Sequence, residues 1–76
     1  MKTVELRTIW VNQYGDTIIK IPGIPPGERD VYVSYKHNST ETSEEFTSLK
    51  EAKGWIYKFR LYSTIIWKEL TVKTRI

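Results

Sequence analysis

The sequence predicts a small α+β domain, a two-layer sandwich in which one helix packs on one face of a mostly antiparallel sheet of four to five strands. Segments with the two-residue period of strands lie on both sides of one segment with the 3.6-residue period of a helix, which favours this arrangement. The chain has 76 residues, the length of a single domain, so we expect one domain over 1–76. The predicted order is strand, strand, strand, an optional short strand, helix, strand.

Two strands and a turn are predicted at the start of the chain. Residues 3–11 (TVELRTIWV) are rich in β-branched and aromatic side chains and predict the first strand. Residues 17–21 (TIIKI) predict the second. Between them, the segment NQYGD predicts a turn in which Gly15 adopts a positive φ. The two strands are therefore expected to form a hairpin.

The next part of the chain predicts a stiff loop, a third strand and an acidic segment. Residues 22–30 hold all three prolines, which lack the backbone donor that a central strand needs, so an exposed loop is expected there. Residues 31–37 alternate apolar and polar side chains and predict the third strand. The following segment is polar and acidic, and a short edge strand over 41–46 is the optional fifth member of the sheet.

The helix is predicted over 48–62. Ser48 is a suitable N-cap, and Glu51 follows three residues later, which is the spacing of a capping box. The apolar residues of this segment fall within an arc of about 120°, the width expected of a helix that covers a sheet. These residues are Leu49, Ala52, Trp55, Ile56 and Phe59. Gly54 lies outside the arc and weakens the helix by about 1 kcal/mol relative to Ala.

After Ser63 the period returns to two, which predicts a last strand. One face of this strand is apolar and consists of Ile66, Leu70, Val72 and Ile76. The other face carries Trp67, Glu69, Thr71, Lys73 and Arg75. We expect the apolar arc of the helix to pack against the apolar face of this strand.

The sequence offers no constellation of residues for catalysis. The absence of Cys excludes thiol nucleophiles and thiolate zinc sites. The single histidine, His37, lies in a polar turn segment, where a solvated role is expected. The glutamates of 41–46 precede the helix, where they complement its dipole, and this favours a structural role over acid-base chemistry. We therefore expect a protein that is not an enzyme and that has no metal site and no cofactor.

Positive charge is concentrated in the second half of the chain. Residues 47–76 carry seven Lys and Arg against two Glu, whereas 41–46 carry three Glu and no cation. A basic surface interleaved with Tyr is a candidate for contact with nucleic acid or with an acidic protein surface. Its candidate residues are Lys50, Lys53, Tyr57, Arg60, Lys73 and Arg75. The alternative is a solvated flank, in which aliphatic stems cover the edge of the core and the charges lie in water.

A second set of candidates suits contact with a protein partner, because large apolar and aromatic side chains are the usual anchors of interfaces. They are Tyr14, Ile24 and Trp67. Ile24 lies between prolines, which lower the entropy lost when a loop is held in a bound shape. Tyr14 is in a predicted turn, where exposure is expected. For Trp10 and Trp55, packing in the core is the favoured interpretation.

Residues 46–55 (FTSLKEAKGW) resemble the end of several small phage domains in which a helix follows a sheet, including integrase arm-binding modules. The phrase is shared by capped helices in general and identifies no family. The preference for Ile and Lys over Ala and Arg is also common in viral and mobile-element genes.

Two classes of function follow from these features. The first is a non-catalytic protein-binding module, in the form of a viral or mobile-element inhibitor that docks on a host complex that handles nucleic acid. The second is a direct nucleic-acid-binding protein that uses the basic helix and strand. A homodimer is compatible with both, since a domain this small has a thin stability margin.

No apolar run approaches the ~20 residues of a membrane span, so we expect no membrane contact. The first residues alternate polar and apolar side chains, unlike a secretory signal, so we expect an intracellular protein in the cytoplasm of the producing or host cell.

Overall fold

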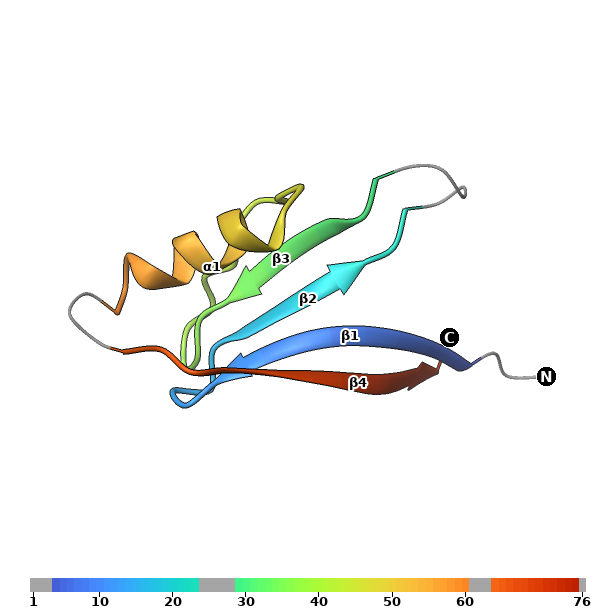
Figure 1. Cartoon of the computed structure of the whole chain (residues 1–76), viewed down its shortest axis with the longest axis horizontal. Coiled ribbons are helices and arrows are strands. Elements are labelled where there is room, and N and C mark those ends of the chain that lie inside the picture. Colours follow the sequence, from blue (N-terminus) through green and yellow to red (C-terminus); the bar gives the residue numbers. More distant parts are fainter. Residues whose placement is uncertain (1–3, 24–28, 61–63, 76) are drawn as a thin grey trace.

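The computed structural model describes residues 4–23, 29–60 and 64–75. They form a four-stranded antiparallel sheet with one helix packed on it, which confirms the predicted small α+β fold (Figure 1). The elements in chain order are β1 (Val4–Asn12), β2 (Thr17–Ile21), β3 (Val31–Tyr35), α1 (Leu49–Tyr57) and β4 (Trp67–Arg75). None of the helices in these ranges is long and apolar enough to cross a membrane.

The sheet has the order β3-β2-β1-β4, so the first and last strands of the chain are neighbours. β1 and β4 pair over nine residues each, from Val4 opposite Arg75 to Asn12 opposite Trp67. β2 joins β1 over only three pairs, at residues 9–11 of β1. The outer half of the β1–β4 pair therefore forms a two-stranded arm, which runs away from β2 toward the end where both termini lie (Figure 1).

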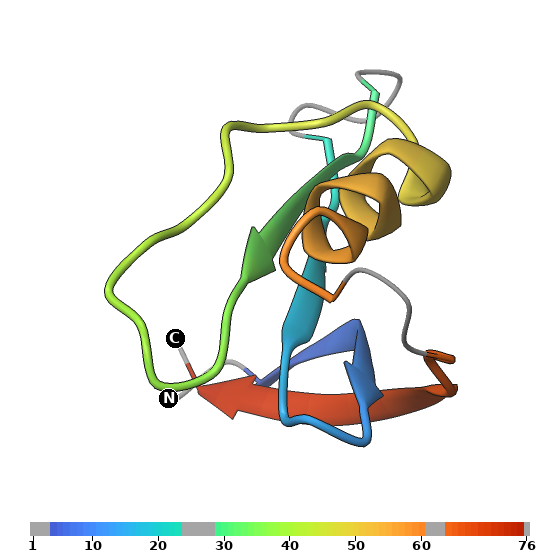
Figure 2. The ribbon, with the colours of Figure 1, turned by 90° about the vertical axis from the view of Figure 1, so that its left-hand side faces the viewer.

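Helix α1 lies beside β3, on one side of the sheet (Figure 2). Ala52 and Ile56 are fully buried on the helix. Opposite them, Trp10 of β1 and Ile18 of β2 are direct cross-strand partners and point to the same side. The core cluster combines Trp10, Ile18 and Ala52 with the partly buried side chains of Tyr32, Phe46, Leu49 and Trp67. We call this side of the sheet the helix side.

The predicted N-terminus of the helix is confirmed. Ser48 is the N-cap, and its hydroxyl oxygen accepts a hydrogen bond of 3.2 Å from the backbone N–H of Glu51. This bond satisfies one of the backbone donors that a helix leaves free in its first turn.

The helix ends at Tyr57, earlier than the predicted residue 62. In the next turn, the backbone N–H groups of Phe59 and Arg60 donate to carbonyls three residues earlier, at 3.0 and 3.1 Å. Such tightened bonds are typical of the final turn of a helix. Phe59 lies beyond the end of the helix, where it is 39% exposed, and its ring contacts Trp55 and Lys36 and is not part of the core cluster.

The prediction that Ile66, Leu70 and Val72 line the core beneath the helix is wrong. The alternation along β4 is as predicted, but the helix covers the other face. Trp67 belongs to the core cluster, whereas Leu70 is 38% exposed and Ile66 is 68% exposed. The reason is that the helix side gathers the larger aromatic side chains, including Trp10, and these bury more apolar area than Leu and Val would.

The optional strand over 41–46 is present only as two isolated bridges along the edge of β3. Tyr32 pairs with Phe46, and Tyr35 pairs with Thr42. Between them, the hydroxyl of Ser43 accepts from the backbone N–H of Ser34 at 2.8 Å, and the hydroxyl of Ser34 donates to the carbonyl of Ala52 at 2.8 Å. The segment therefore closes the β3 edge and is linked through Ser34 to the helix.

Candidate functional site

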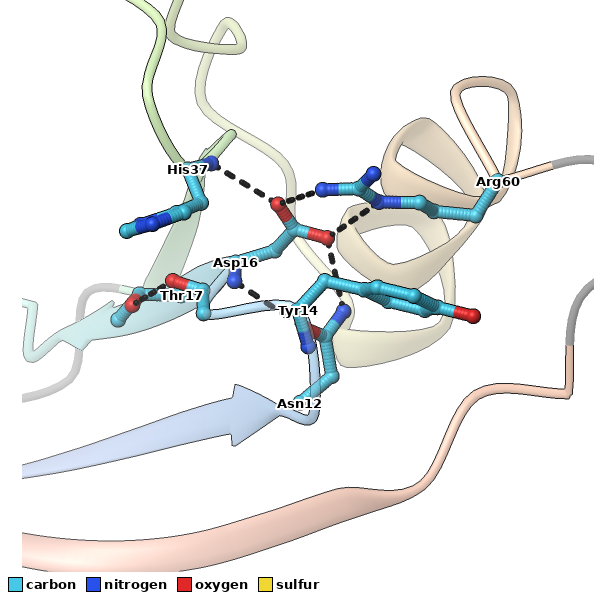
Figure 3. Close-up of polar contacts among 7 residues, drawn as sticks. Asn12, Tyr14, Asp16, Thr17, His37 and Arg60 are labelled. Carbon is cyan, nitrogen blue, oxygen red and sulfur yellow. Dashed lines mark hydrogen bonds and ion pairs between the residues drawn. The ribbon is translucent and has the colours of Figure 1, made fainter.

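A buried carboxylate joins three distant parts of the chain at one end of the sheet (Figure 3). The side chain of Asp16 is fully buried in the turn between β1 and β2. Arg60, which follows the helix, donates to both carboxylate oxygens of Asp16, at 2.9 and 3.0 Å. The Asn12 amide and the backbone N–H of His37 also donate to Asp16, each at 2.9 Å. The cluster thus fastens the first turn, the end of β3 and the end of the helix to one another.

The turn sequence makes this placement of Asp16 feasible. The side-chain oxygen of Asn12 accepts from the backbone N–H groups of Tyr14 and Asp16, at 2.9 and 3.1 Å, and this holds the turn closed. Gly15 has φ +88°, which confirms the predicted positive φ. A Cβ at this position would lie 2.9 Å from Nδ1 of His37. Gly15 is therefore required both by its φ and by the close approach of the imidazole ring.

Burial on its own would raise the pKa of the Asp16 carboxyl. The hydrogen bonds from Arg60, His37 and Asn12 and the charge of Arg60 outweigh burial and lower this pKa from 3.8 to about 2. The Asp16 hydrogen bonds likewise raise the pKa of Arg60. The pair is therefore ionised at neutral pH.

The cluster is built for structure rather than for proton transfer. An ionised carboxylate has about four acceptor positions, and four donors from Arg60, Asn12 and His37 fill those of Asp16. A general base needs an acceptor position within reach of the proton that it removes. Within the described ranges, no group of three His, Cys, Asp or Glu side chains is placed to hold a metal ion.

Two sequence-predicted binding residues, Arg60 and Tyr14, belong to this cluster. The guanidinium of Arg60 is committed to Asp16, so it does not extend the basic surface of the helix. Tyr14 was expected to be exposed, but it is half-buried, because its ring stacks on the Arg60 guanidinium, 4.4 Å from ring centroid to Cζ. Sequence reasoning did not identify Asp16 itself, since a lone Asp after Gly is usual in a turn.

The basic residues of the helix lie around Trp67. Lys53 sits over the Trp67 ring at 5.8 Å, and the indole N–H of Trp67 donates to the hydroxyl of Tyr57 at 3.2 Å. Trp67 is half-buried, so it is less available than the sequence suggested. Lys50 is exposed on the same helix. The structure thus brings Lys53, Tyr57 and Trp67 together, although they had been assigned to two different candidate surfaces.

The remaining candidates lie elsewhere. Lys73 is exposed on β4, in the arm and outside the helix contact. Arg75 occupies the last position of β4, and its side chain lies outside the described part of the chain. Ile24 also lies outside the described residues. At the base of its loop, the backbone N–H of Gly23 donates to Asp30 at 3.0 Å.

The face of the sheet opposite the helix side carries an apolar row that crosses all four strands. Val33 pairs with Ile19, and Ile9 pairs with both Ile19 and Leu70, so these four side chains point to one face. Val33 is buried, Ile9 and Ile19 are half-buried and Leu70 is exposed, and none of the four belongs to the core cluster around the helix. In the part of the chain that the structure describes, no helix or strand packs over this row. We call these four residues the apolar row and the surface that they cross the helix-free face.

A hollow of about 320 Å³ opens at one end of the helix-free face. It is lined by Val11, Asn12, Gln13, Ile66, Lys68 and Leu70. The side-chain amide of Gln13 shapes it, because it donates to the carbonyl of Thr64 and accepts from the backbone N–H of Ile66. These bonds hold the segment before β4 beside the first turn and leave the Ile66 side chain largely in solvent.

The helix-free face carries charged residues on β1 and β4. Arg7 lies opposite Val72, and Lys68 lies opposite Val11 at the rim of the hollow. The same register places Glu5 on this face, two positions before Arg7 on β1. The face therefore combines an apolar centre with charged residues at its margins, and Lys68 is an exposed cation at the rim of the hollow.

Sequence reasoning assigned Ile66, Leu70 and Val72 of this face to the core and did not identify the face as a surface. A signal for the open face was present, because β1 and β2 carry adjacent apolar residues at Ile9-Trp10-Val11 and Ile18-Ile19. Consecutive apolar residues in a strand make both faces of a sheet apolar. One helix of nine residues can cover only one of them.

No protein-family model matches this chain, and no curated protein or solved structure is significantly similar to it.

Proposed function

We propose that this chain is a non-catalytic protein-binding domain and that the helix-free face is its binding surface. The observation that carries this proposal is the open end of the apolar row, where Leu70 is 38% exposed and the neighbouring Ile66 is 68% exposed, whereas Val33 at the other end is buried. Soluble monomers rarely leave large contiguous apolar patches open, and such patches commonly mark sites of interaction. The adjoining hollow of about 320 Å³ would receive an apolar anchor from the partner.

The chemistry of the face selects one kind of partner. An apolar centre needs an apolar counterpart, and the exposed cation of Lys68 at the rim of the hollow favours carboxylates beside it. The partner that fits is therefore a protein surface with apolar side chains bordered by Asp and Glu. An inhibitor of a host complex that handles nucleic acid, encoded by a virus or mobile element, is the form of this function that the composition favours.

The non-catalytic part of the proposal is supported by the state of Asp16. It is the one fully buried carboxylate among the described residues, and donors from the chain itself occupy its acceptor positions. His37 contributes its backbone N–H to this cluster, and its side chain is exposed. We therefore assign Asp16 to stability and assign no turnover to the chain.

Direct nucleic-acid binding is the alternative function. Lys50 is exposed on the helix and Lys53 is half-buried, and a phosphate backbone would be attracted to both cations. Two contacts weigh against this alternative: Arg60 is paired with Asp16, and Lys53 lies over the Trp67 ring. Both contacts remove cations from the surface that the sequence suggested.

Selection of binders from a random peptide library tests the proposal. The bait is the wild-type chain, and each selected peptide is then measured against Leu70→Arg, Ile66→Arg and the double variant Lys50→Ala, Lys53→Ala. We expect apolar peptides with acidic flanks that lose about tenfold or more in affinity with the first two variants and bind the third as they bind the wild type. Both apolar positions are exposed, so folding of these variants should be preserved.

Binding of mixed-sequence duplex DNA at two salt concentrations completes the experiment. Micromolar affinity that falls steeply with salt and is abolished by the double lysine variant would favour the nucleic-acid alternative. Peptides that are insensitive to both Leu70→Arg and Ile66→Arg would exclude the helix-free face as the binding surface.

A further inference from the structure

The two edges of the sheet differ in how they are protected. The β3 edge is closed by the bridges to Thr42 and Phe46. The β4 edge has nine residues, and none of the described residues pairs with its outer side. β4 contains no proline, and its pairing with β1 is continuous and without a bulge. Long, regular edges of this kind are templates for pairing with another strand.

The arm gives a second reason to expect a partner strand. Beyond Thr8 and Thr71 it consists of β1 and β4 alone, since β2 pairs with β1 only at residues 9–11. Two-stranded ribbons are marginally stable in water, and a third strand or a helix is normally needed. Leu6 in this arm is 62% exposed, which shows how little of the arm is covered.

From these features we propose that two copies of this chain associate through antiparallel pairing of β4 with β4, with Thr71 of each copy at the two-fold axis. The result would be a continuous eight-stranded sheet. The arm of each copy would then lie beside the inner half of β4 in the other copy, so each arm would gain a third and a fourth strand. A two-fold axis requires the same surface on both copies, as a strand paired with itself provides.

The sequence of β4 is complementary to itself in this register. Glu69 of one copy faces Lys73 of the other, which makes two opposite-charge pairs, one on each side of the axis. On the other face of the sheet, Leu70 faces Val72 of the second copy, which makes two apolar pairs. Because both helices lie on the same side of the joined sheet, the two helix-free faces would also form one surface.

Neighbouring registers are less complementary. Centred on Leu70, the pairing sets Lys68 opposite Val72 and Glu69 opposite Thr71. Centred on Val72, it sets Thr71 opposite Lys73. The register centred on Leu70 pairs no opposite charges within β4, whereas the register centred on Val72 sets Glu69 opposite Arg75 but leaves Lys73 opposite Thr71. Lysines on a strand also discourage edge pairing, so Lys73 would oppose association in any register that leaves it without a carboxylate.

Cross-linking tests the register. Thr71→Cys places two thiols at the axis, within the Cα separation that a disulfide needs, so mild oxidation should convert most of the chain into a covalent dimer. Lys73→Cys is the matched control, because its thiols would lie four residues apart along the paired strands, beyond disulfide reach. Equal cross-linking of the two variants, or none in either, would overturn the proposed register.

Charge exchange tests the association itself. By analytical ultracentrifugation, the wild-type chain should pass from monomer to dimer as its concentration rises. Glu69→Lys and Lys73→Glu should each weaken dimerisation about tenfold or more, because each sets like charges opposite one another twice. The double exchange should restore the wild-type dissociation constant to within about threefold.

A wild-type chain that stays monomeric at every concentration would overturn the proposal, as would a dimer that the charge variants leave unchanged. The proposal does not depend on the helix-free face binding a foreign partner. Ile66→Arg lies outside β4 and should leave dimerisation unaffected, so failure of one proposal can be told apart from failure of the other.

Discussion

The helix side and the helix-free face are both apolar, but they differ in what fixes them. On the helix side, Trp10 and Ile18 pack with the helix, and the Ser34 hydroxyl is bonded to the carbonyl of Ala52. On the helix-free face, the apolar row passes from buried Val33 to exposed Leu70, and no helix or strand among the described residues packs over it. The difference teaches that apolar content alone does not separate a core from an interaction surface. What separates them is whether the rest of the chain covers the face.

The largest expected effect lies on the helix side. Ile56 is fully buried, so Ile56→Ala should lower the free energy of unfolding by about 2–5 kcal/mol through lost burial and the cavity left behind. In a domain of this size that loss is a large part of the total stability. Urea denaturation followed by circular dichroism measures it. A variant that unfolds at the wild-type urea concentration would contradict the assignment of this face as the core.

The next effect concerns the Asp16 cluster, which fastens the helix side at one end. The folded-state pKa of Asp16 is about 2, below its ordinary 3.8, so its stabilisation is complete above pH ~4 to 5 and is lost as the pH falls through 3.8 toward 2. The shift corresponds to about 2 kcal/mol. We expect the free energy of unfolding to decline by that amount over this window.

Asp30 provides the matched control for this pH dependence. It pairs with Lys20 at 3.5 Å, but its side chain is 43% exposed. Asp30→Asn should therefore keep most of the acid sensitivity, whereas Asp16→Asn should remove it. The reverse result would show that Asp16 is not the group that titrates.

The sequence predicted the fold well where one local signal was sufficient. The period of each strand, the Ser48 cap and the positive φ of Gly15 each depend on a few neighbouring residues, and each agrees with the structure. The class of fold followed from their order along the chain.

The choice of face could not be predicted in the same way. Alternation in β4 places Leu70 and Trp67 on opposite sides of the sheet. It does not show which of these two residues points toward the helix. That depends on the pairing of β4 with β1, which brings Trp67 to the side of Trp10. The Asp16–Arg60 pair was missed for a related reason: its members are 44 positions apart, and no local pattern joins them.

A smaller effect should come from two glycines, one in the helix and one in the turn between β1 and β2. Gly54 lies in the helix, and a Cβ there would meet nothing within 4 Å. Gly54→Ala should therefore stabilise the fold by about 1 kcal/mol through helix propensity. Gly15→Ala is the matched opposite, since φ +88° and the nearby His37 ring penalise a side chain, and it should destabilise the fold by about 1–2 kcal/mol. Thermal melting of both variants measures the two signs, and equal signs would contradict this account.

The smallest effect on stability is expected on the helix-free face. Its size tests directly whether that face is covered in solution. Leu70 is 38% exposed and lies outside the core cluster, so Leu70→Thr should change the free energy of unfolding by no more than about 0.5 kcal/mol when measured on dilute monomer. Thr suits a strand, so the backbone pairing with Ile9 should persist. If Leu70→Thr instead costs as much as Ile56→Ala, the face is covered in solution and is not available to a partner. If stability is unchanged while binding of the selected peptides falls, the same apolar side chain that adds little to folding is kept at the surface for recognition.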